Sequence, residues 1–401
     1  MKQLQSLQNY LLENKLYFDD KSFSQYQNEL NKIKFFIKDT RPNNLVLSYE
    51  GNNPLISIYL IANLKNLNYS LILGDYKKLQ KISTDELGIN YFEDSENILK
   101  PNSFFLTTSG TTGEPKLVNI DLKNLFESIK DINGETDRWL LTYNPNSYAG
   151  LQVILTAVFN SHFLYSTSNN NPKNLFELIS QNNINRISGT PTFWKLLINF
   201  NKNFKSINLK NITLGGEIAE QELLNKLKDL FPNSKINHIY ATTETGVVFS
   251  VSDLFEGFPK EYLEKYNLRL VNNELHILDK NNKWFNTKDI CEVKNNRIIF
   301  KGRDEENIKI AGRKVNILKV ENILISSELI EDAIVHAKKN PITGFIVSAE
   351  IKLKEKNSSN IQKVDDFIKT LNRYDRPSTY KIVDKISLNR NLKKSRKQNE
   401  E

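Results

Sequence analysis

A short segment, Phe105-Leu-Thr-Thr-Ser-Gly-Thr-Thr-Gly-Glu-Pro-Lys-Leu-Val118, combines hydroxyls, glycines and one lysine directly after an apolar run. Gly110 and Gly113 allow the backbone to turn sharply and to approach a ligand closely, and Lys116 adds a compact positive charge. The hydroxyl donors of the segment are Thr107, Thr108, Ser109, Thr111 and Thr112. A polyphosphate needs many donors, little side-chain bulk and a cation, so the segment is a candidate nucleotide site.

The segment differs from the phosphate-binding loop of the common nucleoside triphosphatases, in which Gly-Lys is followed by Ser or Thr and then by a helix. Here Pro115 precedes the lysine and Leu117 follows it. Segments rich in Ser, Thr and Gly also form ordinary turns, and that interpretation stays open. The density of hydroxyls and the Pro-Lys ending favour the nucleotide site.

Composition indicates a globular protein of more than one domain. The 401 residues exceed an average domain, and 39% hydrophobic with 25% charged residues are typical of a soluble protein with sizeable cores. No apolar run approaches the ~20 residues that cross a bilayer, and the N-terminal residues lack the apolar segment of a signal peptide. We therefore expect a cytoplasmic protein without membrane insertion.

Cysteine, histidine and charge exclude several other classes of site. Cys291 is the single cysteine, and the four histidines lack ligand spacing, so we expect no disulfide and no zinc or iron centre. The net charge of +8 is spread along the chain apart from the basic run Arg390–Lys397. We expect an anionic substrate and no nucleic-acid partner. Nucleic-acid binding through the basic tail is the rival interpretation, and it predicts a steeply salt-dependent affinity.

Alternating apolar and amphipathic stretches predict a fold built from βα units. Residues up to about Asn44 have apolar side chains at helical spacing and predict amphipathic helix. The strands predicted after them are Leu45–Tyr49, Tyr69–Leu73, Arg138–Tyr143, Arg186–Ser188 and Ile212–Leu214. The predicted helices between and after these strands are Pro54–Leu64, Leu151–Phe159, Phe193–Phe200 and Glu220–Leu230. This alternation favours an α/β fold with a mainly parallel sheet.

The pattern changes near Leu268 to short strands, predicted at Leu275–Leu278, Ile290–Val293 and Arg297–Phe300. After a charged segment at Gly302-Arg-Asp-Glu-Glu, helices are predicted at Asn316–Ser327 and Ile361–Leu371, with strands at Ala333–His336, Gly344–Ser348 and Tyr380–Asp384. We therefore predict two domains. Residues 1–302 form a large domain of mixed, largely parallel sheets with flanking helices and a small β-rich part, and residues 303–401 form a small, mobile α+β domain.

Four further segments follow the hydroxyl-rich loop in a fixed order. Gly215-Gly-Glu217 comes directly after a predicted strand, at the end where open α/β sheets bind ligands. Tyr240-Ala-Thr-Thr-Glu-Thr-Gly246 combines an aromatic ring, hydroxyls and one carboxylate. Trp284-Phe-Asn-Thr-Lys-Asp289 ends on an acid, and Gly302-Arg-Asp-Glu-Glu-Asn-Ile-Lys-Ile-Ala-Gly312 leads into the predicted small domain.

These segments, in this order, resemble the adenylate-forming superfamily, which includes acyl-CoA synthetases, adenylation domains of peptide synthetases and luciferase-like enzymes. The resemblance runs from about Leu45 to Arg396, and the Thr-Ser-Gly-Thr-Thr-Gly-x-Pro-Lys loop is its most specific motif. The portion before this loop is short, as in o-succinylbenzoate-CoA ligases and in ligases that load small acyl groups onto carrier proteins. Both types remain open.

The resemblance assigns roles in binding ATP and Mg²⁺. It implies that the β- and γ-phosphates lie in the loop from Thr107 to Lys116, whose binding residues are Thr108, Ser109, Gly110, Thr111, Thr112, Gly113 and Lys116. It also implies that Gly215, Gly216 and Glu217 border the adenine, on which Tyr240 stacks. Thr243 contacts the α-phosphate and Glu244 holds Mg²⁺, while Asp289 and Arg303 bind the ribose hydroxyls.

The resemblance also implies the chemistry. Lys393 stabilises the charge that develops as a substrate carboxylate attacks the α-phosphate and pyrophosphate leaves, and Lys394 is the competing register. The small domain then rotates at Glu305, which replaces the usual Asp or Lys of this hinge. The loop around Gly312 enters the site, and a thiol from CoA or from phosphopantetheine on an acyl carrier protein attacks the acyl-adenylate to give a thioester.

Several positions depart from the family pattern. Ala241, Lys288 and Leu392 each replace a glycine. If the glycine before Lys393 has a positive φ, Leu392 costs on the order of 1 kcal/mol. Two rivals stay open. One is an enzyme that stops at the acyl-adenylate or passes it to a carrier protein, and the other, suggested by the substitutions around Leu392, is a nucleotide-binding homologue without turnover.

The segment that borders the acyl group in the family is Asn144-Pro-Asn-Ser-Tyr-Ala-Gly150, with Ser147 where many relatives have His or an aromatic residue. No acidic residue lies between Leu140 and Ala157 to pair with a substrate ammonium, so an α-amino acid is disfavoured. We expect a small to medium non-amino acid, aliphatic or aryl, in a pocket that includes Ser147, Tyr148, Thr190 and Pro191. Phe193 and Trp194 line one wall of that pocket or pack in the core at the start of a helix.

Overall fold

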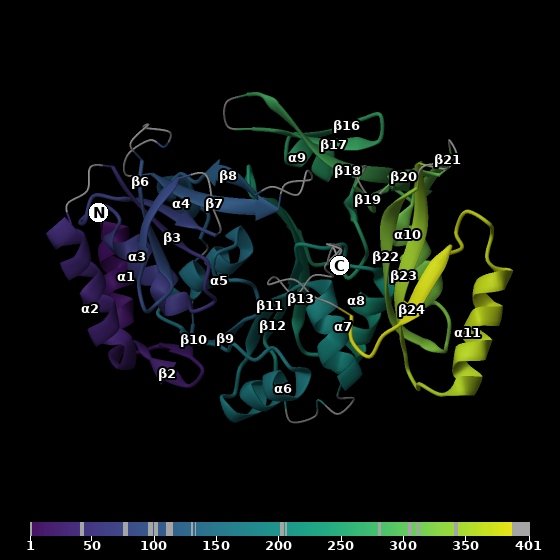
Figure 1. Ribbon diagram of the computed structural model, residues 1–401, viewed down its shortest axis with the longest axis horizontal. Coiled ribbons are helices and arrows are strands. Elements are labelled where there is room, and N and C mark those ends of the chain that lie inside the picture. Colours follow the sequence, from purple (N-terminus) through teal and green to yellow (C-terminus); the bar gives the residue numbers. More distant parts are fainter. Residues whose placement is uncertain are drawn as a thin grey trace. The chain divides into compact units, whose positions relative to one another are not determined.

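The computed structural model describes residues 2–40, 44–74, 79–94, 99, 103–109, 115–129, 131–132, 134–200, 204, 207–279, 282–303, 307–310, 313–340 and 344–386. The chain divides into two compact units, Met1–Glu256 and Gly257–Glu401 (Figure 1). This division falls before the predicted domain boundary at residue 303, which stays a prediction. Each unit combines helices with at least one mixed sheet, which confirms the α/β fold class.

The first unit contains two sheets. The strands of sheet A are β1 (Leu16–Phe18), β2 (Lys21–Ser22), β9 (Arg138–Leu141), β10 (Phe163–Ser166), β11 (Arg186–Gly189), β12 (Asn211–Gly215), β13 (Lys235–Thr242) and β14 (Gly246–Val251). Their order across the sheet is β14-β13-β12-β11-β9-β10-β1-β2. The run from β13 to β1 is parallel, and β14 and β2 are antiparallel to their neighbours.

Sheet B is mixed. Its strands are β3 (Leu45–Tyr49), β4 (Ser70–Leu73), β5 (Gln80–Thr84), β6 (Ile89–Glu93), β7 (Phe104–Ser109) and β8 (Pro115–Asn119), in the order β5-β6-β3-β4-β7-β8. The pairs β3–β4 and β4–β7 are parallel, so the carboxyl ends of these three strands lie at one edge. The helices of the first unit are α1 (Lys2–Leu12), α2 (Phe23–Thr40), α3 (Pro54–Asn63), α4 (Leu122–Glu127), α5 (Tyr148–Phe159), α6 (Pro172–Gln181), α7 (Pro191–Phe200) and α8 (Gln221–Leu230).

Helix α3 joins the two sheets through the core. Each of its residues is buried, and it contacts β1 of sheet A and β4 of sheet B. Its start follows from local chemistry: the Asn53 side chain accepts a hydrogen bond from Leu55 N, and Pro54 occupies the first turn, where a missing N–H costs nothing. An apolar helix of this kind belongs between two layers rather than on the surface.

The second unit also contains two sheets. Sheet C has strands β15 (Phe258–Pro259), β16 (Leu268–Val271), β17 (Glu274–Leu278), β18 (Trp284–Lys294) and β19 (Arg297–Arg303), in the order β15-β19-β18-β17-β16. Sheet D has β20 (Asn307–Ile310), β21 (Arg313–Asn316), β22 (Ile330–Asn340), β23 (Gly344–Leu353) and β24 (Thr379–Ile382), with β24 parallel to β23. The helices are α9 (Tyr262–Lys265), α10 (Ile317–Ile325) and α11 (Ser358–Thr370).

The prediction of continuous helix up to Asn44 is wrong. Strands β1 and β2 separate α1 from α2, and β1 extends sheet A beside β10. Asn14, Asp19 and Asp20 have positive φ, a conformation that Asn and Asp tolerate in turns, and they bracket β1. Pairing with a strand far away in the sequence decides this segment, so the local apolar spacing predicted the wrong element.

Candidate active site

The hydroxyl-rich segment begins in β7 and ends in β8. The two strands pair antiparallel up to Ser109 opposite Pro115, and Gly110, Thr111, Thr112 and Gly113 lie outside the described residues. Thr108 and Ser109 are on β7, and Lys116 is exposed on β8. The segment therefore follows the carboxyl end of a strand that is parallel to β4.

Gly74, which follows β4, permits a close approach to this strand. A β-carbon at Gly74 would lie 1.7 Å from Thr107 Oγ1, and the residue has φ of +125°. Gly74 N donates to Tyr49 O (2.9 Å), and Ser48 Oγ donates to Gly74 O (2.7 Å). Only glycine fits both the backbone angle and the space here. The two hydrogen bonds connect Gly74, which packs against β7, to the end of β3.

The carboxyl edge of sheet A collects most of the other predicted site residues. We use this term for the residues that follow the ends of β9, β11, β12 and β13. They include Ser147 and Tyr148 after β9, Thr190 and Pro191 after β11, Gly216 and Glu217 after β12, and Thr243 and Glu244 after β13. Gly215 is the last residue of β12. Because these strands are parallel, segments far apart in sequence meet at one edge.

Thr190 and Glu217 both bond to the first turn of α7. Thr190 Oγ1 accepts a hydrogen bond from Phe193 N (3.0 Å), and Glu217 Oε2 accepts one from Thr192 N (2.9 Å). A carboxylate at a helix N-terminus is favourable because the N–H groups there lack partners within the helix. Phe193 and Trp194 are fully buried, so they pack in the core at the helix start.

Tyr143 connects β9 to β12. Its hydroxyl donates to Gly215 O (3.3 Å), beside the predicted adenine segment. Burial raises the pKa of the Tyr143 hydroxyl, and the charge of Glu217 raises it further. The neutral phenol is therefore the form that holds the Gly215 carbonyl at neutral pH.

Ser147 and Tyr148 begin α5. Ser147 Oγ accepts from Gly150 N (3.1 Å) and donates to Asn144 O (2.8 Å), so the serine caps the helix. The Tyr148 hydroxyl reaches the turn after β13, since a β-carbon at Gly246 would lie 2.7 Å from its oxygen. Gly246 has φ of +78°. The predicted acyl segment and the predicted α-phosphate segment are therefore neighbours.

The turn between β13 and β14 presents Thr243 and Glu244. Thr242 Oγ1 accepts from Thr245 N (3.0 Å) and closes the turn, and Glu244 is exposed. Tyr240 stacks on Phe249 with ring centroids 5.2 Å apart and planes 23° apart. This stacking fixes the plane of the Tyr240 ring beside a β-bulge between Tyr240 and Ala241.

In the second unit, Asp289 and Arg303 face each other across β18 and β19. Arg303 Nε donates to Asp289 Oδ1 at 3.0 Å, and the Asp289 side chain is 13% exposed against 52% for Arg303. Lys288, which replaces a family glycine, has φ of +63°. A lysine in this left-handed region carries strain of about 1 kcal/mol or more that glycine would not. Lys393 and Glu305 lie outside the described residues.

Cys291 follows Asp289 on β18 and is 2% exposed. Burial raises the pKa of its thiol to about 12, and the Asp289 charge adds to this effect. A thiol of this kind stays protonated and unreactive at neutral pH.

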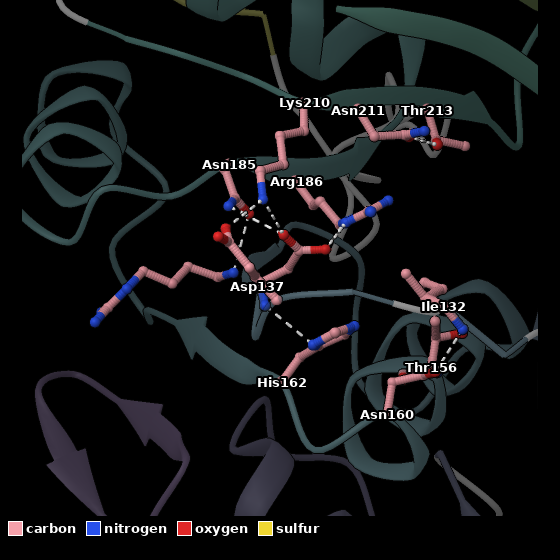
Figure 2. Close-up of polar contacts among 12 residues, drawn as sticks. Ile132, Asp137, Thr156, Asn160, His162, Asn185, Arg186, Lys210, Asn211 and Thr213 are labelled. Atoms are coloured by element: carbon pink, nitrogen blue, oxygen red, sulfur yellow. Dashed lines mark hydrogen bonds and ion pairs between the residues drawn. The ribbon is translucent and has the colours of Figure 1, made fainter.

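The opposite edge of sheet A contains ionised groups. The amino-edge network consists of Asp137, His162, Asn185, Arg186 and Lys210 (Figure 2). The Asp137 carboxylate forms an ion pair with Arg186 and accepts from Lys210 Nζ (3.1 Å) and Asn185 Nδ2 (3.1 Å). Burial alone would raise the pKa of Asp137, but the hydrogen bonds from Arg186 and Lys210 outweigh it and lower the pKa.

His162 supports the same network from the start of β10. Its Nδ1 accepts a hydrogen bond from Asp137 N (3.0 Å), which requires the neutral ring. Burial lowers the pKa of His162, and the positive charges of Arg186, Lys15 and Lys210 lower it further against the opposing effect of Asp137. The ring is therefore neutral at pH 7.

Sequence reasoning missed the amino-edge network and Asn146. The network residues come from separate strand starts, and no motif connects them. Asn146 lies within the predicted acyl segment, but the sequence does not distinguish its buried amide from the partly buried Asn144 two residues earlier. The available signal was the position of Asn146 between Pro145 and the helix cap Ser147, where a polar side chain can bond to neighbouring backbone groups.

Two further findings concern cations and membranes. Within the described ranges, no group of three or more His, Cys, Asp or Glu side chains is arranged to hold a metal ion. None of the helices in these ranges has the length and apolar character needed to cross a membrane.

Residues 27–289 match the family model described as AMP-binding enzyme. The chain belongs to this family, and thus to the adenylate-forming superfamily. The putative long chain fatty acid-CoA ligase VraA of Staphylococcus epidermidis is 23% identical over 400 residues, covering 91% of this chain and 86% of the relative. The 3,4-dihydroxybenzoate–[aryl-carrier protein] ligase of Bacillus anthracis is 23% identical over 331 residues, covering 80% of this chain and 76% of the relative.

A longer relative is gramicidin S synthase 2 of Aneurinibacillus migulanus, which is 22% identical over 367 residues. The match covers 78% of this chain but spans only 8% of that protein.

Solved structures of family members have the same fold. The anthranilate CoA ligase AuaEII in complex with anthranoyl-AMP has a TM-score of 0.69 at 15% identity, covering 98% of this chain and 95% of that one. The o-succinylbenzoate coenzyme A synthetase of Bacillus subtilis in complex with ATP and magnesium ion has a TM-score of 0.65 at 18% identity, covering 97% of this chain and 98% of that one. At these identities the likeness establishes the fold, which confirms the architecture expected from the sequence.

Proposed function

We propose that this chain is an ATP-dependent ligase that converts a non-amino carboxylic acid to its acyl-adenylate and then to a thioester, with CoA as the acceptor. The observation that carries the proposal is the carboxyl edge of sheet A. Four segments with glycines, hydroxyls and the two carboxylates of Glu217 and Glu244 meet there in a chain that belongs to the AMP-binding enzyme family.

The first half-reaction joins the acid to AMP. A carboxylate oxygen of the substrate attacks the α-phosphorus, a new P–O bond forms, and the bond to the β-phosphate oxygen breaks so that pyrophosphate leaves with the electron pair. The loop from Thr108 to Lys116 holds the departing phosphates, and Thr243 contacts the α-phosphate. Lys393 stabilises the negative charge that develops in the transition state.

Adenosine binding is proposed for Gly215, Gly216, Glu217 and Tyr240, with Asp289 and Arg303 on the ribose hydroxyls. The stacked pair of Tyr240 and Phe249 supports a flat site for a base. The bonds of Glu217 and Tyr143 hold the backbone around Gly215 in place.

Glu244 fits a role in binding Mg²⁺. Magnesium prefers oxygen ligands and is held mainly by one or two carboxylates together with substrate phosphates. The exposed carboxylate of Glu244 matches that pattern, because the part of the chain that the structure describes holds no cluster of three or more acidic, His or Cys side chains that could hold a metal ion. When bound, the cation would neutralise part of the negative charge of the ATP phosphates.

The second half-reaction transfers the acyl group. The thiol sulfur loses its proton to solvent and attacks the acyl carbon, a C–S bond forms, and the C–O bond breaks so that AMP leaves with the electron pair. We propose that residues 303–401 form the domain that moves between the two steps, with Glu305 at its hinge. An acyl carrier protein is the alternative acceptor, because one relative is named as an aryl-carrier protein ligase.

The acid is small to medium and either aliphatic or aryl. The segment that begins α5 contains no acid to pair with an ammonium. The proposed pocket consists of Ser147, Tyr148, Thr190 and Pro191. The Ser147 hydroxyl already bonds to Asn144 O and Gly150 N. We therefore propose that the Tyr148 ring provides most of the contact with the acid.

Carboxylate-dependent pyrophosphate release tests the proposal. A panel of acids is supplied with Mg-ATP to the wild type and to Lys393→Ala and Lys394→Ala. Release that one class of acid stimulates and Lys393→Ala abolishes is the expected result. Loss only in Lys394→Ala would move the catalytic role by one residue.

ATP binding without release for any acid would favour the non-catalytic homologue suggested by the substitutions around Leu392. Product analysis with CoA and with a phosphopantetheinylated carrier protein separates the two acceptors.

A further inference from the structure

Asn146 is a buried asparagine whose side chain joins sheet A to sheet B. It lies between β9 and α5 and is 4% exposed. Its Nδ2 donates to Gly51 O (2.7 Å) and to Tyr49 O (3.1 Å), and its Oδ1 accepts from Ser57 Oγ (2.8 Å). Both amide hydrogens and the amide oxygen are therefore used, and a buried polar group with complete bonding fixes a specific arrangement.

The partners of Asn146 lie at the end of β3, in the sheet that carries the hydroxyl-rich loop, and in helix α3. Tyr49 ends β3, Gly51 follows it, and Ser57 is in α3. Tyr49 O also accepts from Gly74 N, and Gly74 is in close contact with Thr107 on β7. One carbonyl thus receives hydrogen bonds from both the Asn146 amide and the residue packed against the strand that leads into the loop.

On the other side, Asn146 is fixed to the start of α5. Its backbone N donates to Asn144 Oδ1 (2.8 Å), and Asn144 O accepts from Ser147 Oγ. A β-carbon at Gly150 would lie 2.0 Å from Asn144 O, so the helix start and this turn are tightly packed. Tyr148 follows directly and reaches Gly246 beside Thr243 and Glu244.

We infer that Asn146 is a positioning residue, which sets the distance between the phosphate loop on sheet B and the acid and α-phosphate segments on the carboxyl edge of sheet A. This inference rests on the proposed function. The attacking carboxylate would be held by one sheet and the departing phosphates by the other. An in-line displacement requires these groups in near-attack geometry, and a shift of about 1 Å costs on the order of 100-fold in rate.

If Asn146 acts by positioning, its substitution should change the rate of the reaction without changing the affinity for AMP. The residues proposed for AMP are on other elements than β7, so AMP binds without the phosphate loop. Replacing the Asn146 amide should therefore lower kcat of acid-dependent pyrophosphate exchange while the Kd for AMP stays close to that of the wild type.

The test compares Asn146→Asp with Asn63→Asp in the full chain. Aspartate keeps the shape and the oxygen that accepts from Ser57, but it removes both donors to the carbonyls. Asn63 is a matched control: it is also 4% exposed, its Nδ2 donates to Tyr59 O (2.8 Å), and it lies at the far end of α3. Exchange of labelled pyrophosphate into ATP, AMP binding by calorimetry and melting temperature are measured for each.

We expect kcat of exchange to fall about 10- to 100-fold in Asn146→Asp, with the Kd for AMP changed less than about threefold. Asn63→Asp should lower the melting temperature by a similar amount and keep kcat within about threefold of the wild type. Equal kcat values in the two variants, or a parallel loss of AMP binding in Asn146→Asp, would overturn the inference.

Ser57→Ala provides a second variant if Asn146→Asp does not fold. It removes one hydrogen bond to Asn146 Oδ1, and a smaller fall in kcat at unchanged AMP affinity is expected, whereas an unchanged kcat would count against the role. Exchange that is absent in the wild type with every acid overturns the proposed function itself. Exchange in the wild type without a difference between the variants overturns only the role of Asn146.

Discussion

The two edges of sheet A use different chemistry. At the amino edge, Asp137 is surrounded by Arg186, Lys210 and Asn185, and each of its carboxylate oxygens is bonded. At the carboxyl edge, the polar groups are glycines, hydroxyls and single carboxylates in turns, such as Glu244 after β13. At the amino edge, the charged side chains pair with one another within the protein. At the carboxyl edge, small side chains and hydroxyls follow the ends of parallel strands.

This difference between the two edges indicates that the groups that stabilise sheet A and the groups proposed to bind substrate lie at opposite ends of its strands. Every parallel strand contributes to both edges, so a change that moves a strand affects both. At the amino edge, the buried Asp137 carboxylate pairs with Arg186 and with the half-exposed Lys210, and these ion pairs contribute to stability. The groups proposed to contact substrate lie at the other end of the same strands. We therefore expect substitutions at the amino edge to change mainly stability, and substitutions in the proposed substrate-binding segments to change activity. Those segments are the carboxyl edge of sheet A and the loop between β7 and β8 of sheet B. Four substitutions test this separation.

The largest loss of stability is expected from Asp137→Asn. Removing the charge leaves Arg186 and Lys210 without their shared partner, and the free energy of unfolding should fall by about 3 kcal/mol, measured by urea denaturation. As a control, Glu222→Gln removes only the exposed pair with Lys226 and should cost less than about 0.5 kcal/mol. Kinetic constants at low temperature should stay unchanged in both. Equal stability losses would show that the network contributes no more than a surface pair.

The opposite result is expected from Lys116→Ala. Because Lys116 is exposed, its removal should leave the free energy of unfolding within about 0.5 kcal/mol of the wild type. Pyrophosphate release should fall about 100-fold, as for the loss of one donor to a developing charge. Lys123→Ala, an exposed lysine on α4, serves as the control for surface charge. Unchanged release in Lys116→Ala would contradict the assignment of the phosphate loop.

A smaller, pH-dependent effect is expected at His162. Burial lowers its pKa in the folded protein below the ordinary value of 6.5, so the unfolded chain takes up a proton first as the pH falls. Stability from the neutral ring is complete above pH 6.5 and is lost as the pH falls from 6.5 towards the lowered folded-state pKa, with a limiting slope of about 1.4 kcal/mol per pH unit. His162→Asn keeps an acceptor for Asp137 N but does not titrate. Urea denaturation between about pH 8 and about pH 5 should show a flatter profile for this variant, and parallel profiles would exclude His162 as the cause.

The smallest effect is expected from Thr190→Ala at the carboxyl edge. Loss of the bond from Phe193 N should cost about 1 kcal/mol, and Thr190→Ser should restore most of it. Because Thr190 also belongs to the proposed acyl pocket, the KM for the acid should change more than the KM for ATP. Asn171→Ala, which removes the cap of α6, should cost similar stability without changing either KM. A KM effect of the same size in both variants would argue against the pocket assignment.

The sequence predicted the parallel core well because local patterns determine it. The predicted strand Leu45–Tyr49 is β3, and the predicted helices Pro54–Leu64 and Phe193–Phe200 correspond to α3 and α7. Glycines after strand ends also indicated where the carboxyl edge lies. These features depend on a few neighbouring residues, which makes them visible in a single sequence.

Features that depend on distant pairing were not predictable. Strand β1 pairs with β10 almost 150 residues later, and its three residues, Leu16–Phe18, are too few to show a strand pattern of their own. The bonds of Asp137 and Asn146 likewise join residues from different strands and loops, so no local pattern marks these two side chains as buried. Their roles follow from three-dimensional contacts alone.

The buried thiol of Cys291 makes this protein suitable for site-specific fluorescence. Since the native thiol is buried and has a pKa of about 12, maleimide reagents should not modify it in the folded protein. Cysteines introduced at exposed positions, one in each compact unit, would accept a donor and an acceptor dye without removal of the native residue. Energy transfer between the dyes would then record, molecule by molecule, whether the distance between the units changes during turnover.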